Sequence, residues 1–208
     1  MSISIIGAGN VGQAIASALS RKGVQVFIGV TDPEKYRKAV LELGDQVSIG
    51  TVEDAIGASE LVILAVPYSA TESIAKSMEN WSGKILVDAT NPLAPALSGL
   101  AIGTTTSGAE QLAQHAVGAR VVKAFNTTGA ENMADSGYSS GVPFMPVCGD
   151  DADARQKVIA LATMIGFDAV DCGDLSVARY LEPFAMVWIH MAIKLGMGRR
   201  FAFARLQR

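Results

Sequence analysis

The chain has 208 residues, of which 50% are hydrophobic and 18% charged, and its formal net charge is -3. This composition supplies a sizeable core for one globular unit. The low fraction of charged residues and the negative net charge argue against a broad surface for the phosphate backbone of a nucleic acid, so we expect no nucleic-acid partner. The amino terminus lacks the basic and apolar regions of a signal peptide, and we expect a soluble, cytoplasmic protein.

The most apolar segment, residues 180–198, does not suit a membrane span. Glu182, Pro183, His190 and Lys194 interrupt it, and its apolar runs are far shorter than the roughly 20 residues that a span needs. We therefore expect a buried or interface helix and no membrane partner.

The two cysteines, Cys148 and Cys172, do not have CxxC spacing, and the chain has only 2 histidines. These features favour buried, reduced thiols and predict no metal site.

Short apolar runs alternate with helix-like segments along the chain. Strands are predicted at residues 3–9, 24–30, 61–67, 84–92, 119–127, 143–149 and 166–173. Helices are predicted at residues 11–23, 32–44, 69–78, 107–116 and 151–166, and from about Ser176. Ser69 with Glu72, and Ser107 with Glu110, have the spacing of capping boxes at two helix starts.

This alternation predicts an α/β fold of the Rossmann type, a doubly wound and mostly parallel sheet with helices on both faces. A helical segment is expected at the carboxyl end of the chain. We predict a single NAD(P)-binding domain over residues 1–208. Its dinucleotide-binding core covers about 1–142, and a substrate-pocket or dimer segment covers about 143–208.

A glycine turn lies between the first strand and the first helix. Gly7, Gly9 and Gly12 have G-x-G-x-x-G spacing, which is meaningful in this strand-to-helix context. They permit a tight turn, close approach of a pyrophosphate and close helix packing, respectively. The amides around Asn10 and Val11 are then expected to face the phosphates.

The carboxyl ends of the other strands should lie along the same cofactor. This geometry selects three groups: Val66, Pro67 and Tyr68; Asp88 to Pro92, including Asn91; and Phe125, Asn126 and Thr127. Asp88 and Asn91 are also typical turn formers, and Tyr68 also suits an ordinary surface position. The loop from Asn91 to Thr106 is long enough to suggest a functional role.

Seven segments occur together in this order in one known family: GAGNVG, AVPYSA, DATNPL, VVKAFNT, PVCGDD, DCGDL and LGMGRRFAFARL. The chain resembles the NADPH-dependent reductases of the deazaflavin coenzyme F-420. The same module resembles the cytoplasmic domain of the six-transmembrane ferric reductases. The resemblance covers essentially the whole chain, and VVKAFNT followed by VCGDD is its most specific part.

The resemblance implies direct hydride transfer between a nicotinamide and a deazaflavin or flavin stacked beside it. This chemistry needs no protein nucleophile or metal, so we assign no catalytic residue. By the family pattern the acceptor ring lies near the segment AFNTTG, which includes Phe125. Asn126, Thr127, Thr128 and Gly129 would lend mostly backbone contacts. Met197 and Gly198 would help to close the pocket.

The family pattern also bears on the choice of cofactor. Members commonly carry a threonine in the glycine turn, where this chain has Ala8. They also carry Gly-Ser-Arg at the end of the second strand, where Val30 replaces the serine and Thr31 replaces the arginine. Only Lys35 remains to hold a 2′-phosphate, and Asp32 would repel one unless it points away or caps the following helix. We expect NADP as the cofactor, with NAD possible.

Several alternatives remain open at this point. The protein is either a reductase of a deazaflavin or flavin-like acceptor, a reductase of an unrelated small molecule, or a dinucleotide-binding sensor without turnover. An imine reductase of the pyrroline-carboxylate type shares the amino-terminal pattern but has a longer helical carboxyl-terminal region. The apolar terminal helix is expected either to cover the sheet or to form a homodimer.

Overall fold

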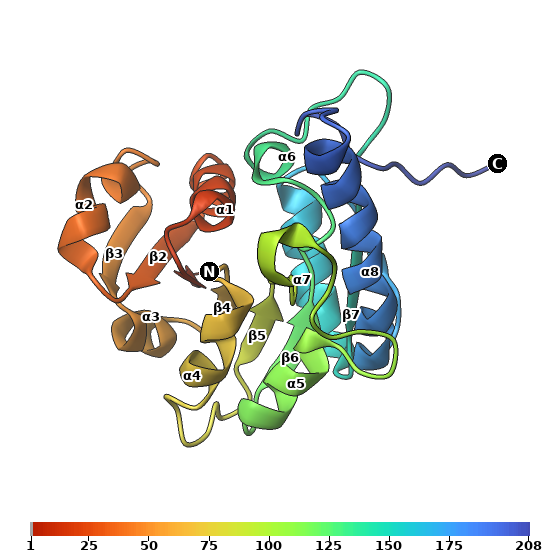
Figure 1. The fold of residues 1–208 in the computed structure, drawn as a ribbon. Helices are drawn as coiled ribbons and strands as arrows, with labels where there is room; N and C mark the ends of the chain where they lie inside the picture. The colour runs from red at the N-terminus through yellow and green to blue at the C-terminus, as the bar shows by residue number, and fades with distance from the viewer. Residues whose placement is uncertain (1) are drawn as a thin grey trace.

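A computed structural model describes residues 2–208 (Figure 1). Eight strands form one sheet in the order β3-β2-β1-β4-β5-β6-β7-β8. The strands are β1 (Ser2–Ile6), β2 (Gln25–Val30), β3 (Val47–Thr51), β4 (Leu61–Leu64), β5 (Ile85–Asp88), β6 (Arg120–Lys123), β7 (Phe144–Gly149) and β8 (Asp168–Asp171).

The first six strands run parallel, and β7 runs antiparallel to β6. All four residues of β4 and of β5 are buried, as expected for central parallel strands covered on both faces. The chain order steps outward from β1 to β3 and then restarts at β4. The β1/β4 boundary is therefore the switch point at which a Rossmann fold opens toward a ligand.

Helices cover both faces of the sheet. They are α1 (Asn10–Ser20), α2 (Pro33–Leu41), α3 (Val52–Ala58), α4 (Thr71–Ala75), α5 (Gly108–His115), α6 (Ala130–Ala134), α7 (Ala152–Met164) and α8 (Ala178–Ile189). Two separate buried clusters show the layers: α1, α2, α6 and α7 contribute to one, and α3, α4, α5 and α8 to the other. The predicted α/β Rossmann-type fold is confirmed.

The sequence prediction missed β3, α3 and α6, and it misplaced one helix start. Ser69 does not cap α4, which instead follows a 3₁₀ turn over Tyr68–Ala70 and has no side-chain cap. At the other predicted start, the Ser107 hydroxyl does accept a hydrogen bond from the Glu110 amide.

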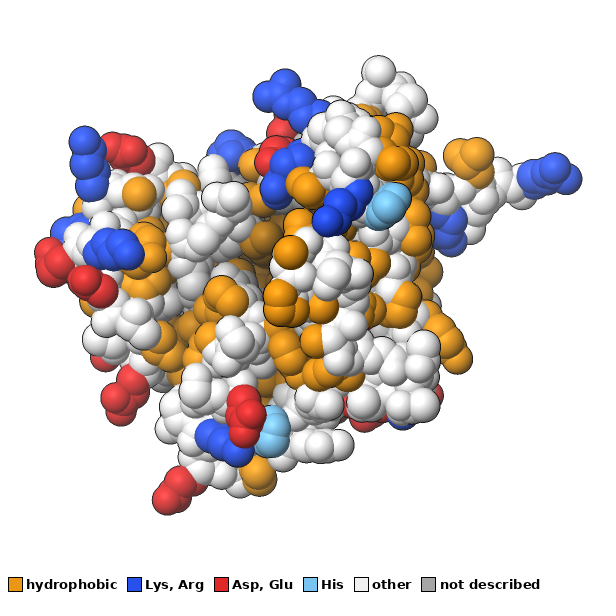
Figure 2. Space-filling model, in the orientation of Figure 1, with side chains coloured by type: hydrophobic (Ala, Val, Ile, Leu, Met, Phe, Trp, Pro, Cys, Tyr) orange, Lys and Arg blue, Asp and Glu red, His pale blue; other side chains and the backbone are white. Residues whose placement is uncertain are grey.

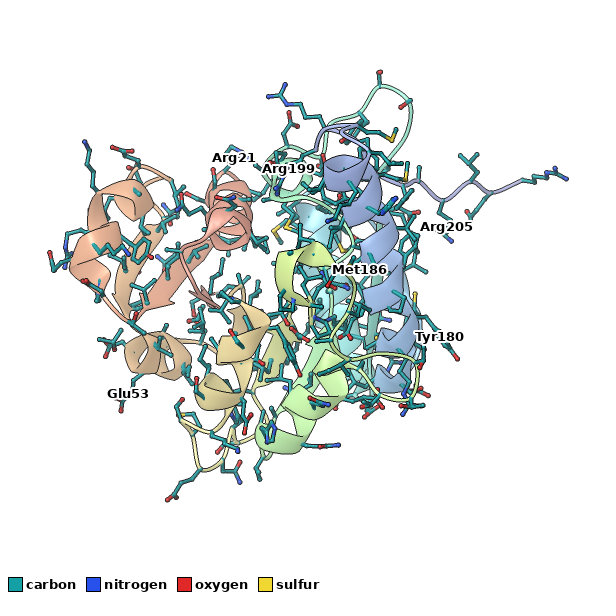
Figure 3. The ribbon with its side chains drawn as sticks, viewed as in Figure 1. Arg21, Glu53, Tyr180, Met186, Arg199 and Arg205 are labelled. Atoms are coloured by element: carbon teal, nitrogen blue, oxygen red, sulfur yellow. The ribbon has the colours of Figure 1, made fainter. Side chains whose placement is uncertain are left out.

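The chain after α8 folds back toward α6. A π-helical turn (His190–Lys194) follows α8, and the next residues reach α6, where Arg199 pairs with Glu131 at 2.8 Å. Arg21, which directly follows α1, donates a hydrogen bond to the Ala134 carbonyl, so both Arg21 and Arg199 contact α6 (Figure 3). Within residues 2–208, no helix is both long and apolar enough to cross a membrane.

Candidate functional site

The glycine turn after β1 has the backbone of a phosphate loop. Gly7 has φ +110°, and a Cβ there would lie 2.4 Å from the Ala65 carbonyl oxygen. A Cβ on Gly12 would lie 2.0 Å from the Gly7 carbonyl oxygen. Gly9 has no atom within 4 Å of its Cβ position. Two glycines are thus required for packing, while Gly9 leaves open space beside the turn.

The start of α1 has free amides at this turn. Gly9 is the extended N-cap residue, no side chain caps the helix, and its first turn has no acid. The Gln13 side chain donates instead to the Ala8 carbonyl at 2.7 Å and braces the turn. Uncapped amides and the positive end of the helix dipole favour an anion such as a pyrophosphate.

A hollow of about 380 Å³ opens beside the turn at the switch point. Six of the predicted cofactor residues line it: Gly7, Ala8, Gly9, Thr31, Val66 and Pro67. Its other walls include Tyr36, Val52 and Ile74, which the sequence analysis did not single out. The wall at the end of β2 is therefore mainly apolar and aromatic, which suits the flat face of a base.

Other predicted cofactor residues lie near this hollow rather than in its wall. Asn10 and Val11 follow the turn in α1, where the Val11 side chain packs on the core. Tyr68 lies half-buried, and its hydroxyl hydrogen-bonds the Gln111 side chain at 2.8 Å. Pro92 is buried in the long loop, where its carbonyl accepts from the Ala101 amide.

The residues that follow β2 have defined structural roles. Asp32 caps α2, accepting a hydrogen bond from the Lys35 amide at 3.2 Å. Its carboxylate is therefore directed toward the start of α2. In this arrangement we do not expect it to repel the 2′-phosphate of NADP. Lys35 is exposed, with its Nζ 5.2 Å from the centre of the Tyr36 ring.

At the ends of β5 and β6, Asn91 and Asn126 form a reciprocal pair. The Asn91 amide nitrogen donates to the Asn126 carbonyl at 2.9 Å, and the Asn126 amide nitrogen donates to the Asn91 side-chain oxygen at 3.0 Å. The same Asn126 nitrogen donates to the Leu181 carbonyl at 3.2 Å. Because that carbonyl only accepts, it fixes the orientation of the Asn126 amide.

Two buried polar atoms beside this pair have no hydrogen-bond partner. Among the described residues, Asn126 Oδ1 and Thr127 Oγ1 are the buried side-chain atoms without a hydrogen-bond partner. Phe125, one residue earlier, is buried at φ +61°, a left-handed conformation that is costly for a bulky side chain. Strain and orphaned polar groups together are typical of a ligand site.

The other residues predicted to contact the hydride-accepting substrate fall into two groups. Thr128 Oγ1 accepts from the Asn132 side chain, and Gly129 packs against Trp188, where a Cβ would lie 2.5 Å from the ring. Met197 and Gly198 are exposed instead. The neighbouring Phe201 makes the contact with this region, because its carbonyl accepts from Asn132 and from the Trp188 ring nitrogen.

A buried charged cluster behind the asparagine pair was not predicted. Lys123, Asp88 and Glu182 are each 0% exposed. Burial acts to lower the pKa of Lys123, but the two carboxylates outweigh it and the net shift is upward. Burial, and then Glu182 and Asp88, raise the pKa of the Tyr68 hydroxyl. A lysine inside an apolar strand was the available signal, since buried lysines require partners.

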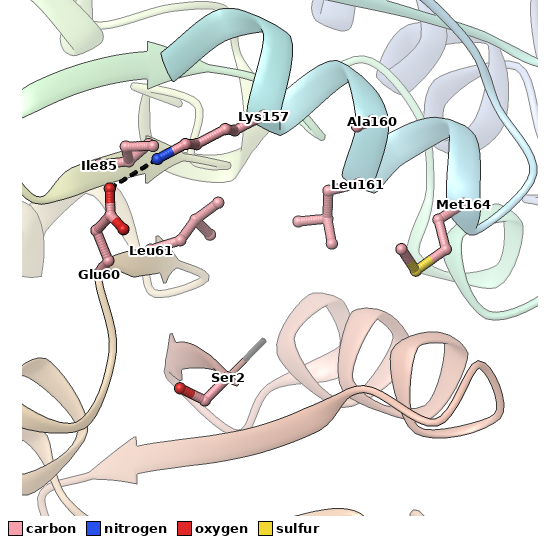
Figure 4. A pocket seen from close by; sticks show the side chains of 8 residues that line it. All are labelled: Ser2, Glu60, Leu61, Ile85, Lys157, Ala160, Leu161 and Met164. Atoms are coloured by element: carbon pink, nitrogen blue, oxygen red, sulfur yellow. Dashed lines mark hydrogen bonds and ion pairs between the residues drawn. The ribbon is translucent and has the colours of Figure 1, made fainter. Parts of the chain in front are cut away.

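A second hollow, of about 500 Å³, lies at the opposite edge of the sheet (Figure 4). Leu61, Ile85 and Leu161 form its apolar wall, and the Glu60–Lys157 ion pair lies at its margin. No glycine turn or strand carboxyl end contributes to it. Although it is the larger hollow, it lacks the features that recognise a dinucleotide.

Comparison with known proteins gives the chain a family. Residues 2–92 match the family model "NADP oxidoreductase coenzyme F420-dependent". The F420-dependent NADP reductase of Methanothermobacter marburgensis is 33% identical over 210 residues, covering 93% of each chain. The metalloreductase STEAP3 of Rattus norvegicus is 30% identical over 88% of this chain, which spans only 36% of that relative.

The solved structures agree with this assignment. A protein from Arthrobacter sp. fb24, solved as a candidate F420-dependent NADP reductase, superposes with a TM-score of 0.88 at 31% identity. The match covers 100% of both chains. Sequence similarity over nearly the full length and the shared fold therefore agree: the chain belongs to the family of F420-dependent NADP reductases.

Proposed function

We propose that this protein is an NAD(P)-dependent oxidoreductase that transfers hydride between NADP and a deazaflavin or flavin-like acceptor. The observation that carries the proposal is the open glycine turn, which places the uncapped start of α1 beside a hollow of about 380 Å³. Family membership supplies the reaction class. The residues present fit a dinucleotide, since the turn would not tolerate side chains at Gly7 or Gly12 and has open space at Gly9.

In this proposal the dinucleotide lies along the carboxyl edge of the sheet. The amides of Asn10 and Val11 bind the pyrophosphate, and Tyr36 and Val52 enclose the adenine. Val66, Pro67 and Tyr68 border the cofactor where β4 ends. Asn91 and Pro92 border its nicotinamide, because β5 lies next to β4 in the sheet.

When bound, NADPH supplies a hydride from its nicotinamide ring, and the acceptor takes that hydride together with a solvent proton. The protein contributes position and exclusion of water rather than a nucleophile. Asn126 Oδ1 and Thr127 Oγ1 provide unsatisfied polar atoms for a carboxamide or a ring carbonyl. Phe125 and Gly129 shape the backbone around the acceptor ring.

NADP remains the proposed cofactor, supported by the family and by Lys35. The capping role of Asp32 removes the strongest objection to a 2′-phosphate. Thr31 replaces a forked guanidinium with one hydroxyl, so we propose weak discrimination against NAD. Ala8 lines the turn without adding a hydrogen-bonding side chain.

The chain is proposed to act as one unit, with residues 1–142 holding the cofactor and 143–208 closing the acceptor side. β7 and β8 extend the same sheet, and the Phe201 carbonyl accepts a hydrogen bond from Asn132 in α6. We also propose a cytoplasmic location, in which the free Cys148 and Cys172 would remain thiols.

A homodimer is proposed through the outer face of α8 and the turn that follows it. Large apolar side chains are exposed there: Tyr180, Val187, Ile193, Leu195 and Met197. Figure 3 shows Tyr180 on the outer side of α8. Elsewhere on the visible face, charged side chains lie mainly along the margin (Figure 2). Light scattering after size exclusion is expected to give a dimer, and Val187→Glu a monomer. A monomeric wild-type protein contradicts this proposal.

The reaction is tested with purified protein, oxidised F420 and either NADPH or NADH, by following loss of the deazaflavin absorbance. Turnover with NADPH is expected, with a smaller but measurable rate for NADH. Calorimetric titration with both cofactors is run in parallel. Binding without turnover would replace the deazaflavin with another acceptor or with a sensor role. Absence of binding would refute the proposed cofactor site.

A further inference from the structure

The buried cluster of Lys123, Asp88 and Glu182 joins three elements of the fold. Lys123 Nζ, at the end of β6, lies 2.9 Å from Asp88 Oδ2 on β5 and 2.9 Å from Glu182 Oε1 on α8. It also donates to the Thr90 carbonyl at 2.7 Å. The ammonium group thus hydrogen-bonds Asp88 and the Thr90 carbonyl and forms an ion pair with Glu182.

The two carboxylates act only as hydrogen-bond acceptors. Asp88 accepts from the Thr90 amide and hydroxyl as well as from Lys123. Glu182 accepts from the amides of Gly108 and Ala109 at the start of α5 and forms an ion pair with Lys123. The ammonium and amide donors around both carboxylates favour the charged form of each.

The cluster therefore holds two negative charges and one positive charge, all of them buried. The amino end of α5 offsets part of the excess, since a helix terminus supplies only about half a charge. A net negative charge remains inside the protein, where solvent screens it far less than at the surface.

The position of this charge is set by chain connectivity. Thr90, which bonds Lys123, directly precedes Asn91. Glu182 directly follows Leu181, whose carbonyl accepts from Asn126. The cluster thus lies immediately behind the asparagine pair. This is the part of the carboxyl edge of the sheet where the proposed function places the nicotinamide.

We propose that Lys123, Asp88 and Glu182 form a fixed anionic centre that favours the oxidised, positively charged nicotinamide over the reduced, neutral one. This inference rests on the proposed function. In the reaction, a C–H bond of reduced nicotinamide breaks and its electron pair leaves with the hydrogen. The acceptor gains that hydride and a solvent proton, and the nicotinamide ring gains one positive charge. Glu182 and Asp88 are positioning residues that stabilise this charge without touching the acceptor.

The test measures dissociation constants for NADP⁺ and NADPH by calorimetric titration, without turnover. The wild-type protein is expected to bind NADP⁺ at least as tightly as NADPH. Glu182→Gln is expected to weaken NADP⁺ by about tenfold, equivalent to about 1.4 kcal/mol, and to change NADPH by less than about twofold. A purely structural defect would weaken both forms equally, and that result would overturn the proposal.

Two further variants complete the test. Asp88→Asn removes the other carboxylate charge and is expected to shift the same ratio in the same direction, so the test does not depend on the folding of one variant. Glu110→Gln is the matched control, because Glu110 lies on α5 but pairs with Arg179 near the surface. The control is expected to leave the ratio unchanged.

The wild-type ratio stands independently of all three variants. A wild-type protein that binds NADPH about tenfold more tightly than NADP⁺ would overturn the anionic centre while leaving the proposed reductase intact. A wild-type protein that binds neither form would refute the proposed function itself. Thermal unfolding of each variant identifies any that is not folded.

Discussion

At the end of β2, charged side chains of α2 lie in solvent, whereas three charged side chains are fully buried where β5 and β6 end against α8. Glu34 and Arg37 pair with each other on the surface, and Lys35 is exposed beside them. Substitutions near β2 therefore act through screened, weak interactions. Substitutions in the buried cluster act through desolvated charges. If the proposed cofactor site is correct, substitutions near β2 can change cofactor choice at little cost in stability, whereas substitutions in the buried cluster also affect folding.

The largest expected effect is the loss of Lys123. Lys123→Met leaves two buried carboxylates without their cation, and we expect it to lower the free energy of unfolding by about 3–5 kcal/mol. Lys157→Met is the control, because Lys157 pairs with the exposed Glu60 and its loss should cost less than about 1 kcal/mol. Urea unfolding measures both. Equal losses would break the contrast between buried and exposed charge.

The glycine turn offers a test that separates folding from binding. Gly12→Ala introduces a Cβ 2.0 Å from the Gly7 carbonyl oxygen and is expected to cost about 1–3 kcal/mol of stability. Gly9→Ala meets no atom within 4 Å, so its stability should change by less than about 0.5 kcal/mol. Its methyl group would instead occupy the space of the pyrophosphate and weaken NADPH by about tenfold. Thermal unfolding and calorimetry distinguish the two outcomes.

At the end of β2, one substitution should change the choice of cofactor. Thr31→Arg supplies a forked donor for a 2′-phosphate, and we expect NADPH to gain about tenfold over NADH in the ratio of dissociation constants. Thr31→Ser is the matched control and should leave the ratio unchanged. If Thr31→Arg tightens both cofactors equally, this position does not read the 2′-phosphate.

The smallest effect is expected at Glu110 on α5, whose burial is intermediate between the exposed charges of α2 and the buried cluster. The hydrogen bond from Arg179 is the main cause that holds the pKa of Glu110 below its usual 4.5. The stabilisation is therefore present above about pH 4.5 and is lost as the pH falls through the lower folded-state pKa. Glu110→Gln should remove less than about 1 kcal/mol of this pH dependence. Unfolding measured from pH 6 to pH 3 tests it.

The parts of the fold that could be predicted are those where one segment carries its own signal. The continuous apolar run at 61–67 predicted a buried parallel strand, and the glycine spacing predicted the turn. β3 was missed because its sequence, VSIGT, is short and only one of its residues is buried. It is an edge strand, and its pairing with β2 rather than its own hydrophobicity defines it.

In the site, too, the features carried by a single segment were predictable, and those created by distant segments were not. Gly7, Thr31 and Pro67 line the hollow because strand ends follow directly from chain order. The partners of Lys123 were not predictable, since Asp88 and Glu182 lie far away in the chain and only the sheet order and the docking of α8 bring them together. The exposed positions of Met197 and Gly198 likewise depend on how the chain folds back after α8.

The reversed direction of β7 has a consequence for how the protein can be redesigned. Because β7 is antiparallel to β6, residues 124–143 stay at the edge where the parallel strands end. Residues 199–203 reach the same region, where Phe201 contacts Asn132 and Phe203 pairs with Phe144. These two segments can be exchanged with those of a relative without interrupting any parallel strand. Chimeras built at these boundaries would test whether acceptor preference follows these segments while the glycine turn and the parallel strands are kept.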